Sequence, residues 1–129
     1  MNLSDCFRHF GAKGRNARWS WSARSEDGRV VVITLWKDRV SVVDGNVIYN
    51  DVDVDTSAWV HRPGNRERLE NLCWARDNCD GFFRAVVVVA ENIKAQPRRI
   101  VQCYPQPNWN MRILDLNEGT GGFRAVHIR

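Results

Sequence analysis

Residues 18–36 read Arg-Trp-Ser-Trp-Ser-Ala-Arg-Ser-Glu-Asp-Gly-Arg-Val-Val-Val-Ile-Thr-Leu-Trp, and their pattern defines the fold class. Apolar residues at 19, 21 and 23 alternate with polar residues at 20, 22 and 24, which predicts a strand with one covered face. A chain reversal is expected next, because Gly28 tolerates positive φ and Asp27 can bond nearby backbone. The apolar, β-branched run over 30–36 then predicts a central strand buried on both faces.

Three indole rings are brought together by this predicted hairpin. Trp19 and Trp21 share one face of the first strand, and Trp36 ends the second strand. Such a cluster forms either the packed centre of a small domain or the wall of a pocket, and the pattern leaves both interpretations open.

The rest of the chain predicts further strands. Residues 1–17 are expected to lie across the sheet as a basic arm with a single helical turn, which Gly11 and Gly14 end. Asp44-Gly45 marks a hairpin turn, and Pro105-Gln106-Pro107 is expected to end a strand. The predicted strands are residues 39–43, 46–50, 82–90, 99–104, 110–116 and 122–128.

One long helix is predicted over residues 63–80. Asn65 is the expected N-cap and Gly81 occupies the position after the helix, while Leu69, Leu72 and Cys73 form the stripe that packs on the sheet. The expected fold class is therefore α+β, with a curved mixed or antiparallel sheet of about seven to eight strands, open or barrel-like, and one main helix across it. A chain of 129 residues predicts a single domain over 1–129.

The start of this helix carries an unusual charge order. Arg62, Arg66 and Arg68 crowd the end where the helix dipole favours acidic groups. An anion such as phosphate would account for this, since free N-terminal amides and guanidinium groups bind it together. Neutralisation by Glu67, Glu70 and the acids of residues 51–55 is the alternative.

Composition predicts a cytoplasmic protein with a moderate positive charge. The chain has no apolar run long enough to span a bilayer and no signal-peptide pattern at residues 1–5. Its four cysteines are expected to be free thiols, because a reducing compartment disfavours disulfides. The net charge is +4, and only three of the 19 basic residues are lysine: Lys13, Lys37 and Lys94. Arginine suits bidentate contacts to phosphate, although a GC-rich genome is an equally good explanation.

Catalytic and metal-binding motifs are weak, so neither a catalytic residue nor a cofactor or metal is predicted. Asp51, Asp53 and Asp55 alternate with valine, but a calcium loop needs glycine and glutamate where Thr56 and Arg62 stand. Residues 73 and 79 are too far apart for a zinc-binding cysteine pair. Residues 119–122 are glycine-rich but precede a strand, whereas phosphate loops open a helix. A non-enzymatic protein is the expectation.

Nucleic-acid binding is the function that the residue types favour. Bases stack on aromatic rings while cations hold the phosphates. Two or three of the six tryptophans are expected in the core, and Trp109 is the best candidate for an exposed ring because it lies in a Pro/Asn-rich segment. The candidate nucleic-acid-binding residues are Arg18, Trp19, Trp21, Arg24, Trp36, Arg62, Arg66, Arg68, Tyr104 and Trp109.

A spaced pattern in the chain resembles a known group of domains. It comprises Trp19-Ser20-Trp21-Ser22-Ala23, Asp27-Gly28, Leu35-Trp36-Lys37-Asp38, residues 66–72 and Pro97-Arg98-Arg99-Ile100. These residues resemble N-terminal domains attached to some bacterial HNH nucleases, which are similar to PUA-like modules that read modified bases in DNA or RNA. The resemblance spans residues 18–100 and implies a base-reading function. It implies no cleavage, because the chain has no nuclease half.

Two other kinds of function stay open. The apolar rings suit a protein-interaction module or a homodimer without catalytic activity. A small molecule bound in a tryptophan-lined cavity is the third alternative. Nucleic acid and a second copy of the chain are thus the candidate partners, and no membrane partner is expected.

Overall fold

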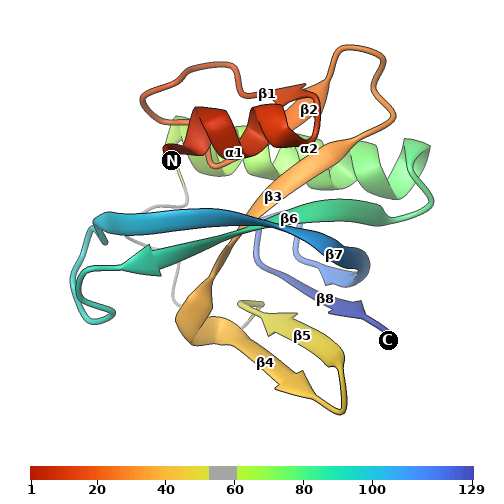
Figure 1. Ribbon diagram of the computed structural model, residues 1–129. Coiled ribbons are helices and arrows are strands. Elements are labelled where there is room, and N and C mark those ends of the chain that lie inside the picture. Colours follow the sequence, from red (N-terminus) through yellow and green to blue (C-terminus); the bar gives the residue numbers. More distant parts are fainter. Residues whose placement is uncertain (53–60) are drawn as a thin grey trace.

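The computed structural model describes residues 1–52 and 61–129, which form an α+β fold (Figure 1). Eight strands make one mixed sheet that does not close into a barrel, and the main helix α2 packs on it. The fold class predicted from the sequence is therefore confirmed. The elements are α1 (Leu3–His9), β1 (Ala12–Lys13), β2 (Ser22–Ser25), β3 (Val31–Trp36), the 3₁₀ turn η1 (Lys37–Arg39), β4 (Val40–Val43), β5 (Asn46–Asn50), α2 (Pro63–Asn78), β6 (Phe82–Ala90), β7 (Ile100–Leu116) and β8 (Phe123–His127).

The sheet has the order β1-β2-β3-β6-β7-β8-β5-β4, so β1 and β4 are its edges. Only β3 and β6 are parallel among the paired strands of the described residues, and their register places Trp36 beside Val88. The C-terminal ends of these two strands consequently meet at one end of the sheet.

The central strand β3 is buried on both faces, as predicted. Residues 31, 33 and 35 pack with α2 and residues of β5 to β8 in the larger core. Val32 instead joins Cys6 and Phe7 of α1 in a smaller core. Because successive side chains of a strand point to opposite faces, this one strand carries both helices.

The first predicted strand is shorter than expected. Trp19 lies in a turn closed by the bond from the Ser20 amide to the Asn16 carbonyl, and β2 begins only at Ser22. The predicted polar face is wrong as well, because Ser20 and Ser22 are buried. Hydrogen bonding compensates for burial of the hydroxyl group: Ser22 Oγ accepts from Asn71 Nδ2 at 2.8 Å.

Helix α2 occupies the predicted segment, but its first turn differs from the prediction. Arg62 is the N-cap residue and Pro63 the first helical residue, where a missing N–H does no harm. Asn65 is therefore not the N-cap; its side chain is buried and donates to the Thr120 carbonyl at 2.9 Å. On the sheet-facing stripe, Leu72 is fully buried, whereas the side chains at 69 and 73 are half-buried.

Strand β7 is longer than predicted. The residues Pro105-Gln106-Pro107 do not end it, because the strand continues from Ile100 to Leu116. Among the described residues its first half pairs with β6 alone, so its other edge makes no strand ladder with them and tolerates proline. A register shift between Ala85↔Gln106 and Arg84↔Asn110 makes residues 107–109 bulge. The β4–β5 hairpin, β6 and the closing β7–β8 hairpin agree with the prediction. The N-terminal arm differs from it, because α1 has seven residues and Ala12–Lys13 form the edge strand β1.

Gly64 has no room for a side chain. A Cβ there would lie 2.5 Å from the Trp19 carbonyl oxygen and 2.8 Å from Cε2 of Trp21. We expect Gly64→Ala to lower the free energy of unfolding by about 1–3 kcal/mol, because overpacking forces the helix away from the indole. Urea denaturation measures this, and Gly119→Ala in an exposed turn is the matched control, with a change of about 0.5 kcal/mol or less. Equal effects of the two changes would contradict the tight packing.

Candidate functional site

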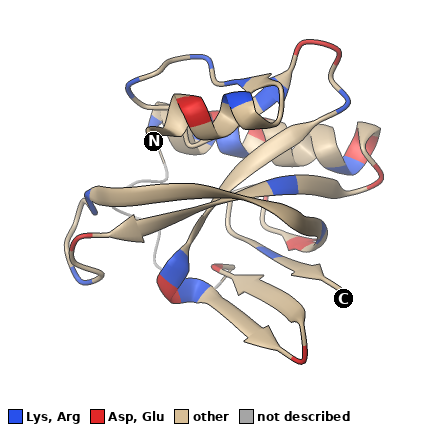
Figure 2. Ribbon diagram, in the orientation of Figure 1, with Lys and Arg blue, Asp and Glu red and all other residues tan. Residues whose placement is uncertain are grey.

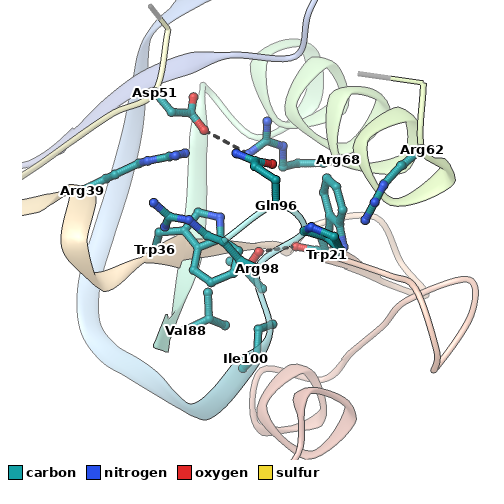
Figure 3. A pocket seen from close by; sticks show the side chains of 12 residues that line it. Trp21, Trp36, Arg39, Asp51, Arg62, Arg68, Val88, Gln96, Arg98 and Ile100 are labelled. Carbon is teal, nitrogen blue, oxygen red and sulfur yellow. Dashed lines mark hydrogen bonds and ion pairs between the residues drawn. The ribbon is translucent and has the colours of Figure 1, made fainter. Parts of the chain in front are cut away.

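The candidate site is a pocket at the C-terminal ends of β3 and β6, with a cavity volume of about 120 Å³ (Figure 3). Its lining comes from segments that are far apart in the chain: the residue before β2, strands β3, β6 and β7, η1, the end of β5, the start of α2 and the β6–β7 loop. Two indoles and four guanidinium groups converge there. The lining residues are Trp21, Thr34, Trp36, Arg39, Asp51, Arg62, Arg68, Val88, Gln96, Pro97, Arg98 and Ile100.

One wall of the pocket is held by Arg98. Its guanidinium carbon lies 4.9 Å from the ring centroid of Trp36, which is a cation–π distance. The same group forms a bidentate ion pair with Asp38, with N···O distances of 2.8 and 3.0 Å. Since the side chains of Arg98 and Asp38 are only 11% and 25% exposed, water screens this pair less than a surface pair. The contacts fix the β6–β7 loop against the end of β3.

The back of the pocket is formed by Arg68 and Asp51. Their side chains are 4% and 0% exposed, and Arg68 Nη1 lies 3.1 Å from Asp51 Oδ2. Arg68 Nη2 also donates to the Gly121 carbonyl at 3.0 Å, and Asp51 Oδ1 accepts from the Phe123 amide at 2.7 Å. Burial, with Asp51 nearby, raises the pKa of Tyr49 above its ordinary range. This network shows that Arg68 has a structural role and is engaged by protein groups.

Two other arginines at the pocket differ from Arg68 and Arg98. Arg39 is half-buried and Arg62 is exposed, and they lie on opposite sides of the pocket in Figure 3. Neither forms an ion pair with a carboxylate of residues 1–52 or 61–129. These two guanidinium groups are therefore free of the acids that hold Arg68 and Arg98 in place.

Basic and acidic residues are otherwise mixed over the molecule, as Figure 2 shows, and η1 carries both at the end of β3. A larger depression of about 770 Å³ lies between α1 and residues 11–20. Its arginines are engaged: Arg8 by Asp5, Arg15 by Glu70, and Arg24 by the Trp74 ring and Asn71. Lys13 also lines this depression and forms no ion pair with an acid of residues 1–52 or 61–129.

The structure brings four of the ten predicted binding residues to the pocket: Trp21, Trp36, Arg62 and Arg68. The other six line no part of it. Arg18 and Arg66 are exposed elsewhere, and Arg24 lies 4.3 Å from the Trp74 ring. The backbone carbonyl of Trp19 lies near Gly64, and Tyr104 is half-buried on β7.

The position of Trp109 differs from the one predicted from the sequence. It lies in the β7 bulge, is half-buried and packs against the larger core, so it is not the exposed ring that was predicted. Sequence reasoning also missed Arg39, Gln96 and Arg98 as pocket residues. The only local signal was that Arg39 follows an apolar strand and that Arg98 lies in a Pro-Arg-Arg run.

The structure describes only some of the acidic residues that were expected to neutralise the start of α2. Asp51 neutralises Arg68 by an ion pair, whereas Asp53 and Asp55 lie outside the described residues. Glu67 accepts from the Arg15 amide at 2.7 Å and Glu70 pairs with the Arg15 side chain. Both acids therefore bind the N-terminal arm, and neither pairs with Arg62.

No cluster of three or more potential metal ligands is found among residues 1–52 and 61–129. Within the same residues no helix is long and apolar enough to cross a membrane. No family model, curated protein sequence or solved structure matches the chain.

The thiols Cys6 and Cys103 form a buried pair in the smaller core. The Cys6 thiol donates to Cys103 Sγ at 3.6 Å, and Cys103 Sγ lies 3.2 Å from the Met1 carbonyl oxygen. Burial raises the pKa of Cys6 to about 12. Because the thiolate is the nucleophile, this side chain is unreactive at neutral pH.

We expect iodoacetamide at pH 8 to leave Cys6 unmodified in the folded protein while it slowly labels the half-buried Cys73 and Cys79. Peptide mass spectrometry identifies the labelled sites. The same reaction in urea is the control and is expected to label all four cysteines. Labelling of Cys6 in the native protein as fast as in urea would contradict the buried pair.

Breaking the Arg68–Asp51 pair is expected to destabilise the fold. Arg68→Met leaves the Asp51 carboxylate buried without its guanidinium partner, which costs about 3–5 kcal/mol of unfolding free energy. Urea denaturation followed by circular dichroism measures the loss, and Arg76→Met on the exposed part of the same helix is expected to change little. The double variant Asp51→Asn/Arg68→Met is expected to lose less than Arg68→Met alone. An equal loss in the two variants would argue against a charge effect.

Proposed function

We propose that the pocket binds a nucleotide unit of a nucleic acid, with the base inside the cavity and its phosphates at Arg39 and Arg62. The observation that carries the proposal is the meeting, in one cavity, of two indole rings with two guanidinium groups that lack a carboxylate partner in the described residues. A flat ring and an anion are the two chemical groups that such a lining complements.

The energies involved are adequate for binding. Stacking of a base on an aromatic side chain contributes about 1–3 kcal/mol. A guanidinium group binds phosphate oxygens through two parallel hydrogen bonds, and its charge releases counterions from the nucleic acid. The half-exposed position of Trp36 and the exposed position of Arg62 allow both contacts from the same side of the molecule.

The resemblance of residues 18–100 to PUA-like base-reading domains points in the same direction, and Trp21, Trp36 and Arg98 lie both in the resembling segments and in the pocket. More specifically, we propose that the pocket recognises a modified base within DNA or RNA. No chemical step is part of it, so the proposed role is recognition. A location in the cytoplasm, where nucleic acid is present and free thiols persist, completes the proposal.

The proposal predicts salt-sensitive binding of oligonucleotides. Fluorescence anisotropy with labelled single-stranded DNA and RNA is expected to show a dissociation constant that rises steeply with salt. Arg39→Gln and Arg62→Gln are each expected to weaken binding and to lower the salt slope by about 0.7, the value for one phosphate contact on a single strand. Arg66→Gln is the matched control, because Arg66 is exposed on α2 outside the pocket and its loss is expected to leave the slope nearly unchanged.

Absence of binding to single-stranded, double-stranded and modified oligonucleotides at low salt would refute the proposal. Equal effects of Arg39→Gln, Arg62→Gln and Arg66→Gln would place the binding outside the pocket.

A homo-oligomeric module is the second candidate, and the edge strand β4 favours it. Val42 and Val43 are 60% and 56% exposed, and the outer edge of the strand pairs with no other described strand, so a second copy can pair there. Light scattering after size-exclusion chromatography distinguishes the two candidates. A dimer that Val43→Lys dissociates would support the module, whereas a monomer at high concentration would exclude self-association.

A further inference from the structure

The room inside the pocket is close to that taken by one six-membered ring. A cavity of about 120 Å³ is slightly smaller than an engineered protein cavity of about 150 Å³ that binds benzene. A pyrimidine has one six-membered ring, whereas a purine carries a second, fused ring. Resting on the proposed nucleotide binding, we propose that the pocket selects a pyrimidine nucleotide within a strand and disfavours a purine.

The walls that set this size are held by contacts of their own. Thr34 Oγ1 donates to the Trp21 carbonyl at 2.8 Å, which ties two lining residues together. Trp36 is held by the stacked guanidinium of Arg98, and Arg98 is held by Asp38. At the back, the buried pair of Arg68 and Asp51 closes the cavity. A pocket fixed on these sides is formed before the ligand arrives and enlarges only at an energetic cost.

Gln96 supplies a polar group that suits the edge of a pyrimidine. Its side chain lies in the pocket of Figure 3 and makes no hydrogen bond to residues 1–52 or 61–129. An amide presents one acceptor and two donor hydrogens side by side. Rotation about its terminal torsion matches it either to a cytosine edge or to a thymine or uracil edge. The pocket is therefore selective for ring size and accepts cytosine, thymine and uracil alike.

The positions of Arg39 and Arg62 suggest that the nucleotide is internal to a strand. They lie on opposite sides of the cavity, and a nucleotide within a strand has one phosphate on each side of its sugar. A free mononucleotide can satisfy only one of the two guanidinium groups. It is therefore expected to bind more weakly than the same nucleotide in a strand.

The test uses strands in which base size is the only variable. Labelled strands of about ten nucleotides are built from abasic sites with a single central cytosine, thymine, adenine or guanine, which removes stacking between bases. Anisotropy is expected to show about tenfold or tighter binding for the two pyrimidines than for the two purines, with cytosine and thymine similar. Uracil in the corresponding RNA context is expected to follow thymine.

A substitution in the pocket wall then tests whether the cavity size causes the preference for pyrimidine. Ile100→Ala removes side-chain volume from the lining, so it is expected to reduce the preference for pyrimidine at least threefold by strengthening purine binding. Ile113→Ala is the matched control, because Ile113 is also half-buried on β7 but lies outside the pocket and is expected to leave the preference unchanged.

The outcomes separate this inference from the proposed function. If no strand binds, both fail. If purine and pyrimidine strands bind equally and Arg39→Gln and Arg62→Gln still weaken binding, nucleotide binding stands and pyrimidine selection is overturned. A pyrimidine preference that Ile100→Ala leaves unchanged also overturns it, because the base is then recognised outside the cavity.

Discussion

The buried ion pair between Arg68 and Asp51 is the contact on which the pocket end of the molecule depends. Two charges taken out of water are costly unless each is fully compensated. Here the Arg68 guanidinium also meets the Gly121 carbonyl, and the carboxylate meets the Phe123 amide. The first turns of α2, the end of β5 and the start of β8 must therefore meet at one point, which brings Arg62 to the rim of the cavity.

The second constraint is the double burial of β3. Its alternate residues belong to two cores. A shift of the strand register by one residue would therefore move every side chain into the wrong core. The parallel pairing with β6 then sets Trp36 beside Val88. The pocket lies where these two strand ends meet the loop carrying Arg98, and its shape is consequently a property of the sheet register.

The features predicted from the sequence are those that depend on local patterns. Strand β3 followed from its apolar run, the β4–β5 hairpin from Asp44-Gly45, and α2 from its helical spacing. The failures involve tertiary contacts. Strand β2 starts late because residues 16–20 form a turn, and Ser22 is buried because it finds a partner in Asn71 of α2. Strand β7 passes through its prolines because one of its edges pairs with no other described strand there.

The pocket was predictable only in part for the same reason. Trp21, Trp36 and Arg62 were recognisable by residue type, but nothing local indicates that Arg39 and Arg98 lie near them. Their proximity follows from strand pairing across more than 50 residues of chain. Trp109 shows the reverse case: a proline-rich segment looked like an exposed loop, whereas the bulge of β7 turns its ring toward the core.

The four arginines at the pocket fall into two groups with different physical consequences. Arg68 and Arg98 are paired with Asp51 and Asp38, so their charges contribute to holding the chain in its folded shape. Arg39 and Arg62 have no such acid in the described residues, and the larger core forms without either of them. Their mutual repulsion is small in water but grows when a ligand excludes water from the cavity.

In the proposed complex, an anion whose ring enters the cavity would reverse this effect, because it would replace repulsion by two attractive contacts where the dielectric constant is low. A neutral ring of the same size would occupy the cavity but leave both guanidinium groups without a partner. In the proposed complex, the charge arrangement and the cavity size thus act on different parts of one ligand. The guanidinium groups would act on its phosphates, and the fixed walls would act on its base.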